Sequence, residues 1–283
     1  MKITHSRLDI GLPKPLSFLH SCDNHLCYAD ERDDERKRDL AVKRRRAFEG
    51  DSNRCTLFLD EMIAYAKEHC DLFLHSGDLL DFVSYRNLEV GKEKMDQVDY
   101  FMAVGNHEFS LYVGEAFEDE AYKRQSYDRV QAAFKNDLTF ASRLIGGLNL
   151  VAIDNGYYLF SEEQLALLKS EVARGYPIIL MLHTPIYTPD LFQEMMVSRK
   201  KECAYLCGCP ATFMGDYSDY RLRQQRPDEP TREFIRYLQT QPLVKALLTG
   251  HLHFNYEGIL FGDTPQFVTG AGYAGDARLI EIV

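Results

Sequence analysis

The sequence predicts an α/β fold whose sheets contain both parallel and antiparallel strands. Short apolar segments alternate with longer segments of helical periodicity along the 283 residues, which is the pattern of α/β proteins. The pair Gly146-Gly147 separates the apolar segments "ASRLI" and "LNLVAI" and predicts a hairpin turn. A hairpin makes its two strands antiparallel, so a purely parallel sheet is disfavoured. Because no repeat and no linker rich in Gly, Ser or Pro interrupts the pattern, we expect residues 1–283 to form a single domain.

The strands are predicted from short apolar segments that end in glycine or polar residues. The clearest of them are 16–21, 71–77, 99–105, 148–154, 178–183 and 244–250. The C-terminal segments "PQFVTGAG" and "RLIEIV" also have the composition of short strands.

Two helices are predicted by their ends and by an apolar face. Residues 161–175 begin with Ser161 and Gln164 at the spacing of a capping box and end at Gly175, a residue favoured just past a helix. Residues 54–70 carry one apolar face for the core. This face consists of Leu59, Met62, Ile63 and Ala66.

Residues 29–46, "ADERDDERKRDLAVKRRR", form a dense run of mixed charge. Such a run is typical of a solvated helix in which side chains four residues apart form ion pairs. Its basic end, Lys43 to Arg46, could instead face an anionic substrate or partner. We favour the solvated helix.

The composition is that of an acidic globular protein. The formal net charge of -10 argues against a general nucleic-acid coat and against binding to anionic membranes. The first twenty residues show no apolar signal-peptide core, and no apolar run is long enough to cross a bilayer. We therefore expect a cytoplasmic protein.

The seven cysteines are an odd number, which fits reduced thiols better than a set of disulfides. The segment "CAYLCGC" could supply three thiolates, from Cys203, Cys207 and Cys209, to a structural zinc. No fourth ligand stands nearby in the sequence, so free thiols are favoured.

Polar side chains able to bind metals follow five of the predicted strands. They are Asp23 and His25; Asp78 and Asp81; Asn106, His107 and Glu108; His183; and His251 with His253. Loops that follow strands converge at one end of an α/β sheet, where ligands bind. We expect the remaining histidines to be structural or exposed. These are His5, His20, His69 and His75.

This combination of ligands indicates a centre for two metal ions. Mixed oxygen and nitrogen ligands suit borderline divalent ions such as Mn, Fe or Zn. The ligands are too many for one tetrahedral site. Two ions about 3.5–4 Å apart would need a bridging carboxylate and would activate a shared water for attack at phosphorus.

The motif series resembles that of the calcineurin-like metallophosphoesterases. Asp-x-His, Gly-Asp-x-x-Asp, Gly-Asn-His-Asp/Glu, His and Gly-His-x-His occur complete and in order between about residues 16 and 254. The resemblance implies two mixed sheets packed as a sandwich and flanked by helices. It also implies hydrolysis of a phosphate ester by a hydroxide that bridges two divalent metal ions.

The resemblance further implies a role for each motif residue. Asp23, His25 and His253 would hold the first metal; Asn106, His183 and His251 would hold the second; Asp78 would bridge the two. His107 would stand near the leaving group as a general acid or as a stabiliser of charge, and Asp81 would orient His107.

At two positions the sequence departs from better-known branches of the family, and these departures narrow the range of possible substrates. Protein serine/threonine phosphatases continue the second motif with Arg-Gly, whereas Phe82 and Val83 follow Asp81 here. Purple acid phosphatases end this motif with a tyrosine that binds ferric iron, and Asp81 takes that place. Both kinds of phosphatase are therefore disfavoured.

The segment between His183 and His251 is longer than a connection between strands requires, and we expect an insertion at about residues 186–230 on the substrate side. Its aromatic and basic residues could stack on a base and bind a phosphate, or they could form a small separate core with solvated arginines. They are Tyr187, Tyr205, Phe213, Tyr217, Tyr220, Arg221, Arg223 and Arg226.

The leading hypothesis is a hydrolase of a small phosphodiester or phosphomonoester, such as a nucleotide. A nuclease of the same superfamily is less favoured because the chain is acidic. A non-catalytic scaffold is disfavoured because every motif residue is present.

Overall fold

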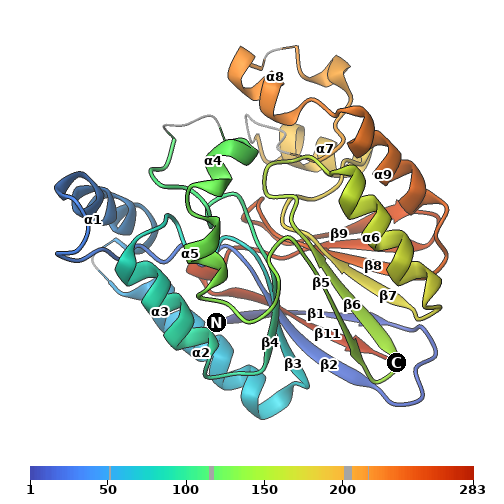
Figure 1. The fold of residues 1–283 in the computed structure, drawn as a ribbon. Helices are drawn as coiled ribbons and strands as arrows, with labels where there is room; N and C mark the ends of the chain where they lie inside the picture. The colour runs from blue at the N-terminus through green and yellow to red at the C-terminus, as the bar shows by residue number, and fades with distance from the viewer. Residues whose placement is uncertain (51, 115–117, 201–205, 216) are drawn as a thin grey trace.

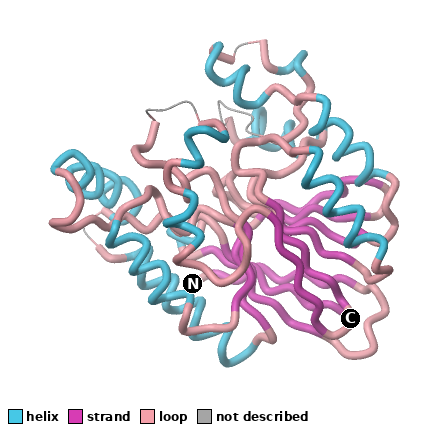
Figure 2. Tube along the Cα trace, viewed as in Figure 1, coloured by secondary structure: helices cyan, strands magenta, loops and turns pink. Residues whose placement is uncertain are grey.

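The computed structural model of this chain contains two β-sheets that pack face to face, with helices on their outer faces (Figures 1 and 2). This architecture confirms the predicted α/β sandwich. The structure describes residues 1–50, 52–114, 118–200, 206–215 and 217–283.

The first sheet is mixed. Its strands lie in the order β1 (Lys2–Leu8), β11 (Asp276–Ile282), β2 (Leu16–Ser21), β3 (Leu72–Ser76) and β4 (Tyr100–Ala103). β2, β3 and β4 are parallel, with Phe18 opposite Leu72 and Phe73 opposite Tyr100, whereas β11 runs antiparallel to β2. The carboxyl ends of three successive strands therefore reach the same edge of this sheet.

The second sheet is also mixed. Its order is β5 (Phe140–Ile145), β6 (Leu148–Ile153), β7 (Ile178–Met181), β8 (Val244–Thr249), β10 (Thr264–Val268) and β9 (Tyr256–Phe261). β6, β7 and β8 are parallel. β5 and β6 form the predicted hairpin, in which Ile145 pairs with Leu148. Both turn glycines have positive φ, 57° at Gly146 and 89° at Gly147, as a tight hairpin turn requires.

Three apolar layers hold the two sheets and their helices together. The layer between the two sheets includes Phe18, Leu74, Phe101, Leu150, Met181 and Leu248. A second layer joins the first sheet to α1 (Glu35–Glu49), α2 (Arg54–His69) and α3 (Tyr85–Met95). A third joins the second sheet to α6 (Glu162–Ala173) and α9 (Glu229–Gln239). The sheets are thus fixed on both faces, and their ends provide a rigid support for the loops between them.

The predicted helices form as expected. α2 buries Leu59, Met62, Ile63 and Ala66, and Ser161 and Gln164 make both hydrogen bonds of a capping box at the start of α6. Within the charged run, α1 begins only at Glu35 because the side chain of Asp34 caps it by accepting from the backbone N–H of Lys37.

Several elements were not anticipated, namely β1, β9, α3 and α9. Shorter helices complete the chain: α4 (Glu120–Arg124), α5 (Tyr127–Gln131), α7 (Pro189–Gln193), η1 (Glu194–Ser198), η2 (Ala211–Phe213), α8 (Asp219–Gln225) and η3 (Gly272–Ala274). In the described part of the chain, no helix combines the length and the apolar character needed to cross a membrane.

Candidate metal centre

The predicted site residues come together where the loops after β2, β3, β4, β7 and β8 meet. Three groups of side chains there could each hold a metal ion, with their ligand atoms within 4.8 Å of one another. The groups are Asp23, His25 and His253; His25, Asp78 and His107; and Asp78, His183 and His251. Residues that are more than 200 positions apart in the sequence thus share one site.

The backbone of these loops is held in an unusual conformation. Among the described residues, seven that are not glycine have positive φ, and five of them belong to the groups above. Those five are Asp23, His25, Asp78, His251 and His253, with φ between 48° and 68°. Such conformations cost energy and persist at functional sites, where the surrounding structure enforces them.

Two glycines of the motifs are explained by close packing against the site. A Cβ atom on Gly105 would lie 2.2 Å from Asp78 Oδ1 and 2.8 Å from His183 Cε1. A Cβ atom on Gly250 would lie 2.8 Å from Asp23 Oδ2. A side chain at either position would therefore displace a residue of the site.

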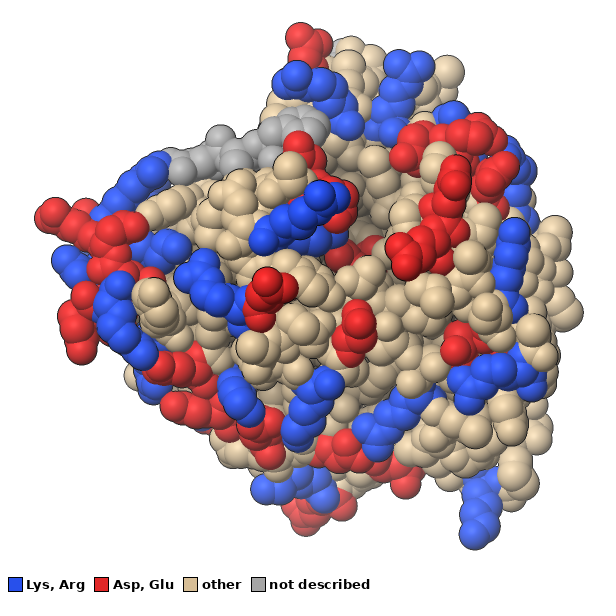
Figure 3. All heavy atoms as spheres, in the orientation of Figure 1, with Lys and Arg blue, Asp and Glu red and all other residues tan. Residues whose placement is uncertain are grey.

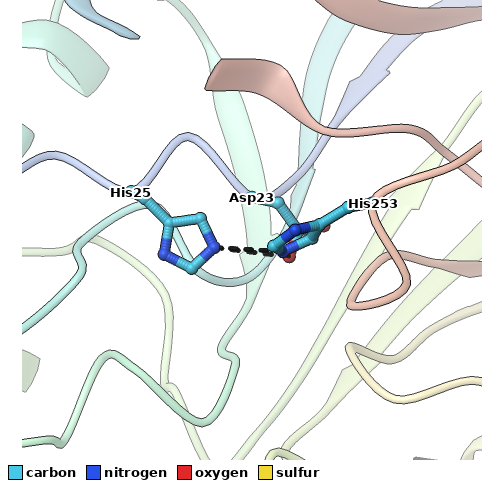
Figure 4. Close-up of side chains that lie close together, drawn as sticks. All are labelled: Asp23, His25 and His253. Carbon is cyan, nitrogen blue, oxygen red and sulfur yellow. Dashed lines mark hydrogen bonds and ion pairs between the residues drawn. The ribbon is translucent and has the colours of Figure 1, made fainter. Parts of the chain in front are cut away.

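The group of Asp23, His25 and His253 joins a loop of the first sheet, after β2, to a loop of the second sheet, after β8. His25 and His253 approach each other at 3.2 Å between their Nε2 atoms, and Asp23 Oδ1 lies 3.3 Å from His253 Nε2 (Figure 4). Asp23 also fixes the partner loop, because its Oδ2 accepts a hydrogen bond from the backbone N–H of His251 at 2.9 Å.

The second group centres on Asp78. Its Oδ2 lies 3.2 Å from His183 Nε2 and 3.8 Å from His25 Nε2, so that the carboxylate stands between the two groups. His183 Nε2 is in turn 3.1 Å from His251 Nδ1. Asn106 lines the same cavity as Asp78 and is buried.

The protonation pattern of the site fits bound cations. His25 Nδ1 donates to Asp81 Oδ1 at 2.9 Å, and His183 Nδ1 donates to the carbonyl of Ser76 at 2.7 Å. Both rings therefore turn Nε2 toward the centre, where a neutral imidazole would offer its lone pair to a metal ion. Among the described residues, the buried Asp23 Oδ1 and Asn106 Oδ1 have no hydrogen-bond partner. A metal ion would satisfy these acceptors, so this donor set fits divalent cations.

Two tyrosines that sequence reasoning missed support the outer sides of the histidines. Tyr158 Oη lies 3.4 Å from His251 Nε2, and Tyr273 Oη lies 3.3 Å from His253 Nδ1. Such partners orient ligand rings. Their positions follow β6 and β10, and no motif marks them.

Asp81 connects two histidines of the site. It accepts from His25 Nδ1, and its Oδ1 lies 3.3 Å from His107 Nδ1, which also donates to the Asp81 carbonyl at 2.8 Å. Burial acts to lower the pKa of His107, but the negative charges of Asp78 and Asp81 outweigh it and raise that pKa to about 10. Burial acts to raise the pKa of Asp81, but hydrogen bonds from Arg44, His107 and His25 hold it well below its ordinary value.

Glu108 organises the backbone beneath the centre. Its carboxylate is fully buried and accepts from the backbone N–H groups of Asp78 at 2.8 Å, Leu80 at 3.1 Å and Gly105 at 2.6 Å. It thereby joins the loop after β3 to the loop after β4. The sequence placed Glu108 in a motif but did not indicate this task.

A cavity of about 670 Å³ opens above the centre. Its floor includes His25, Asp78, Asn106, His107, His251 and His253. Its walls include Arg44, Phe48, Met195, Lys200, Tyr220 and Arg221. The basic end of the charged run therefore contributes one residue, Arg44, to the site. Much of α1 is exposed, as expected of a solvated helix, but its Lys37, Ala41 and Phe48 are buried.

The segment between β7 and β8 combines both roles considered for it. Tyr187 and Tyr217 pack into a small separate core around Leu191 and Met214, whereas Tyr220 and Arg221 line the cavity. Phe213 is 48% exposed but stacks on Tyr187 at the edge of this core, with ring centroids 6.1 Å apart. Arg223 and Arg226 line other hollows, and Tyr205 lies outside the described residues.

The structure shows no cysteine in a candidate metal group within the described residues. Cys207 and Cys209 are buried free thiols, and Cys203 lies outside the described residues. The histidines expected to be structural or exposed are so placed: His20 and His75 are buried and hydrogen-bonded, and His5 and His69 are exposed.

Comparison with known proteins agrees with this geometry. The sequence model for the calcineurin-like phosphoesterases matches residues 17–255. No curated protein matches the sequence. The fold is similar to that of a dimetal phosphatase from Danio rerio, with 12% identity, a TM-score of 0.50, and coverage of 91% of this chain and 88% of that one.

The fold is also similar to that of a purple acid phosphatase from yellow lupin (Lupinus luteus) seeds. The identity is 15%, the TM-score is 0.56, and the alignment covers 93% of this chain. It covers only 45% of the lupin enzyme, so this chain spans less than half of that protein. At these identities the likeness concerns the fold.

Proposed function

The chain belongs to the calcineurin-like phosphoesterase family, which hydrolyses phosphoric esters with the help of metal ions, and we propose that its substrate is a small phosphate ester. One observation carries the proposal. Side chains from five separate strand ends form three overlapping ligand groups, and five of these side chains line a cavity of about 670 Å³. Cavities of this size are typical of sites for small molecules.

Two divalent ions, such as Mn, Fe or Zn, would share these ligands. Asp23, His25 and His253 would hold the first ion, and Asn106, His183 and His251 the second. Asp78 would bridge the ions, which its position between the two groups supports. When bound, the ions would supply positive charge beside the phosphoryl group and an activated water for the attack.

The protein's own contribution to proton transfer would come from His107. Its Nδ1 is engaged by Asp81, so the ring presents Nε2 to the cavity that it lines. The nearby carboxylates favour the protonated ring. In that state Nε2 can donate its proton to the oxygen of the leaving group.

The cavity walls favour a small anionic ester with an apolar or aromatic part. Lys200 and Arg221 supply positive charge, while Phe48 and Met195 supply apolar surface. We propose that residues 186–230 form the substrate-side insertion of a single domain, since Met195, Lys200, Tyr220 and Arg221 of this segment line the cavity.

A nuclease is less well supported. On the face drawn in Figure 3, Lys and Arg side chains are interspersed with Asp and Glu among the described residues. A continuous basic stripe is the usual footprint of nucleic-acid binding. The net charge of -10 points the same way.

The experiment is hydrolysis of bis(p-nitrophenyl) phosphate and of p-nitrophenyl phosphate by the Mn²⁺-loaded protein. Asp78→Asn, which weakens the bridging position, is the control. Turnover that Asp78→Asn abolishes supports the proposal, and the preferred ester assigns the substrate to diesters or to monoesters. No turnover of either ester at any divalent metal tested would refute it.

A further inference from the structure

We propose that Arg44 of α1 is a positioning residue, which holds the Asp81 carboxylate in the plane required to orient His107. The inference rests on the proposed function, because its consequence for turnover needs His107 to act in the reaction. Arg44 lies outside the five motifs, in the run of charge that resembles a solvated helix.

The contact between Arg44 and Asp81 is two-pronged. Arg44 Nε donates to Asp81 Oδ2 at 2.6 Å, and Nη2 donates to Asp81 Oδ1 at 2.8 Å. The Asp81 side chain is 0% exposed and that of Arg44 is 24% exposed. Two parallel hydrogen bonds from a planar guanidinium fix both the position and the plane of a carboxylate.

The plane of the Asp81 carboxylate determines the orientation of two imidazole rings. Asp81 Oδ1 accepts from His25 Nδ1 at 2.9 Å and lies 3.3 Å from His107 Nδ1. The two rings are 4.8 Å apart and nearly perpendicular, at 86°. If the carboxylate could rotate, Oδ1 would no longer lie near the Nδ1 atoms of both rings. By fixing the carboxylate, Arg44 therefore restricts the orientation of both imidazoles.

The helix that carries Arg44 is itself attached to the loops of the site. Lys37 Nζ donates to the carbonyl of Val83 at 2.7 Å, and Arg45 Nη2 donates to that of Cys27 at 3.0 Å. Phe48, one turn after Arg44, stacks on His25 with ring centroids 4.4 Å apart and planes at 9°. The Arg44 guanidinium lies 4.8 Å from the centre of the Phe48 ring. α1 therefore holds Arg44 in place rather than leaving it free in solvent.

The test uses the full chain with Arg44→Ala, Arg44→Lys and the matched control Arg45→Ala. The control removes a neighbouring guanidinium that also anchors α1 but does not touch Asp81. Turnover is measured at saturating Mn²⁺ on p-nitrophenyl and phenyl esters of the preferred class, with and without millimolar guanidinium.

In Arg44→Ala, kcat on the phenyl ester should fall by about 10²-fold, which is the lower end of what a positioned acid supplies. The kcat on the p-nitrophenyl ester should fall less, because p-nitrophenolate leaves without being protonated. KM should change by less than about 3-fold, and guanidinium should restore part of the rate. Arg45→Ala should retain most of the wild-type rate, because Lys37 and Phe48 still attach α1 to the site. Arg44→Lys, which keeps the charge but cannot make the two-pronged contact, should remain impaired and serves if the alanine variant does not fold.

Several results would overturn the inference. These are an equal loss of kcat on both esters, a rise in KM without a fall in kcat, or a loss of kcat in Arg45→Ala as large as that in Arg44→Ala. A second measurement does not depend on turnover: the Nδ1–H proton resonances of His25 and His107 by NMR. Their loss in Arg44→Ala supports the positioning role and their persistence refutes it, even if the wild-type protein hydrolyses neither ester and the proposed function fails.

Discussion

Replacing Gly105 by alanine should disable the metal centre through the space that one methyl group occupies. The new Cβ would lie 2.2 Å from Asp78 Oδ1, whereas ordinary contacts begin at 3.4 Å. Gly105 does not have a positive φ, so the substitution acts by crowding and not by backbone strain. The chain must relieve this overlap by moving Asp78, His183 or its own backbone.

The size of the effect follows from the overlap. If Asp78 bridges two ions as proposed, its carboxylate would have to move by about 1 Å, and a misplacement of ~1 Å costs on the order of 10²-fold in rate. Forcing an extra methyl group into close-packed surroundings should also lower the free energy of unfolding by about 1–3 kcal/mol. Gly105→Ala should therefore remain folded but lose turnover and bound metal.

The assay compares Gly105→Ala with Gly215→Ala. A Cβ on Gly215 would meet no atom within 4 Å of the described structure, and Gly215 does not have a positive φ. Metal content by mass spectrometry, urea unfolding and hydrolysis of p-nitrophenyl esters are measured for both. If Gly105→Ala retains wild-type turnover and two metal equivalents, the reasoning about close approach is wrong.

Three further outcomes are expected. His107→Ala should keep its metal but lose turnover by ~10²–10⁴-fold; wild-type rates on an ester with a poor leaving group would contradict its role as acid. Mn²⁺ should stabilise the wild type, by about 2.7 kcal/mol at ~100 times its Kd, because buried Asp23 Oδ1 and Asn106 Oδ1 gain a partner; unfolding curves that Mn²⁺ does not shift would count against the site. Ser161→Ala should cost about 1 kcal/mol by removing one bond of the capping box without changing turnover; an unchanged urea midpoint would show that this cap adds nothing.

The strands and the motif residues could be predicted because their signals are local. An apolar segment followed by Gly-Asp or Gly-His is visible within about ten residues, and parallel strands bring such ends to one edge of a sheet. The hairpin at Gly146-Gly147 and the capping box at Ser161 are local in the same sense, and the structure confirms both. Strands β1 and β9 were missed because they are only partly buried and lack a continuous apolar run.

The sequence alone determined the α/β class, the family motifs and the set of residues from which a metal centre could be built. Only the tertiary structure placed Arg44 on Asp81, Phe48 on His25, and Tyr158 and Tyr273 behind the histidines. These residues belong to segments whose composition is equally compatible with solvent or with core. The physical reason is that a contact between residues distant in the sequence depends on how the layers of the fold pack. The local periodicity of a sequence carries no information about that packing.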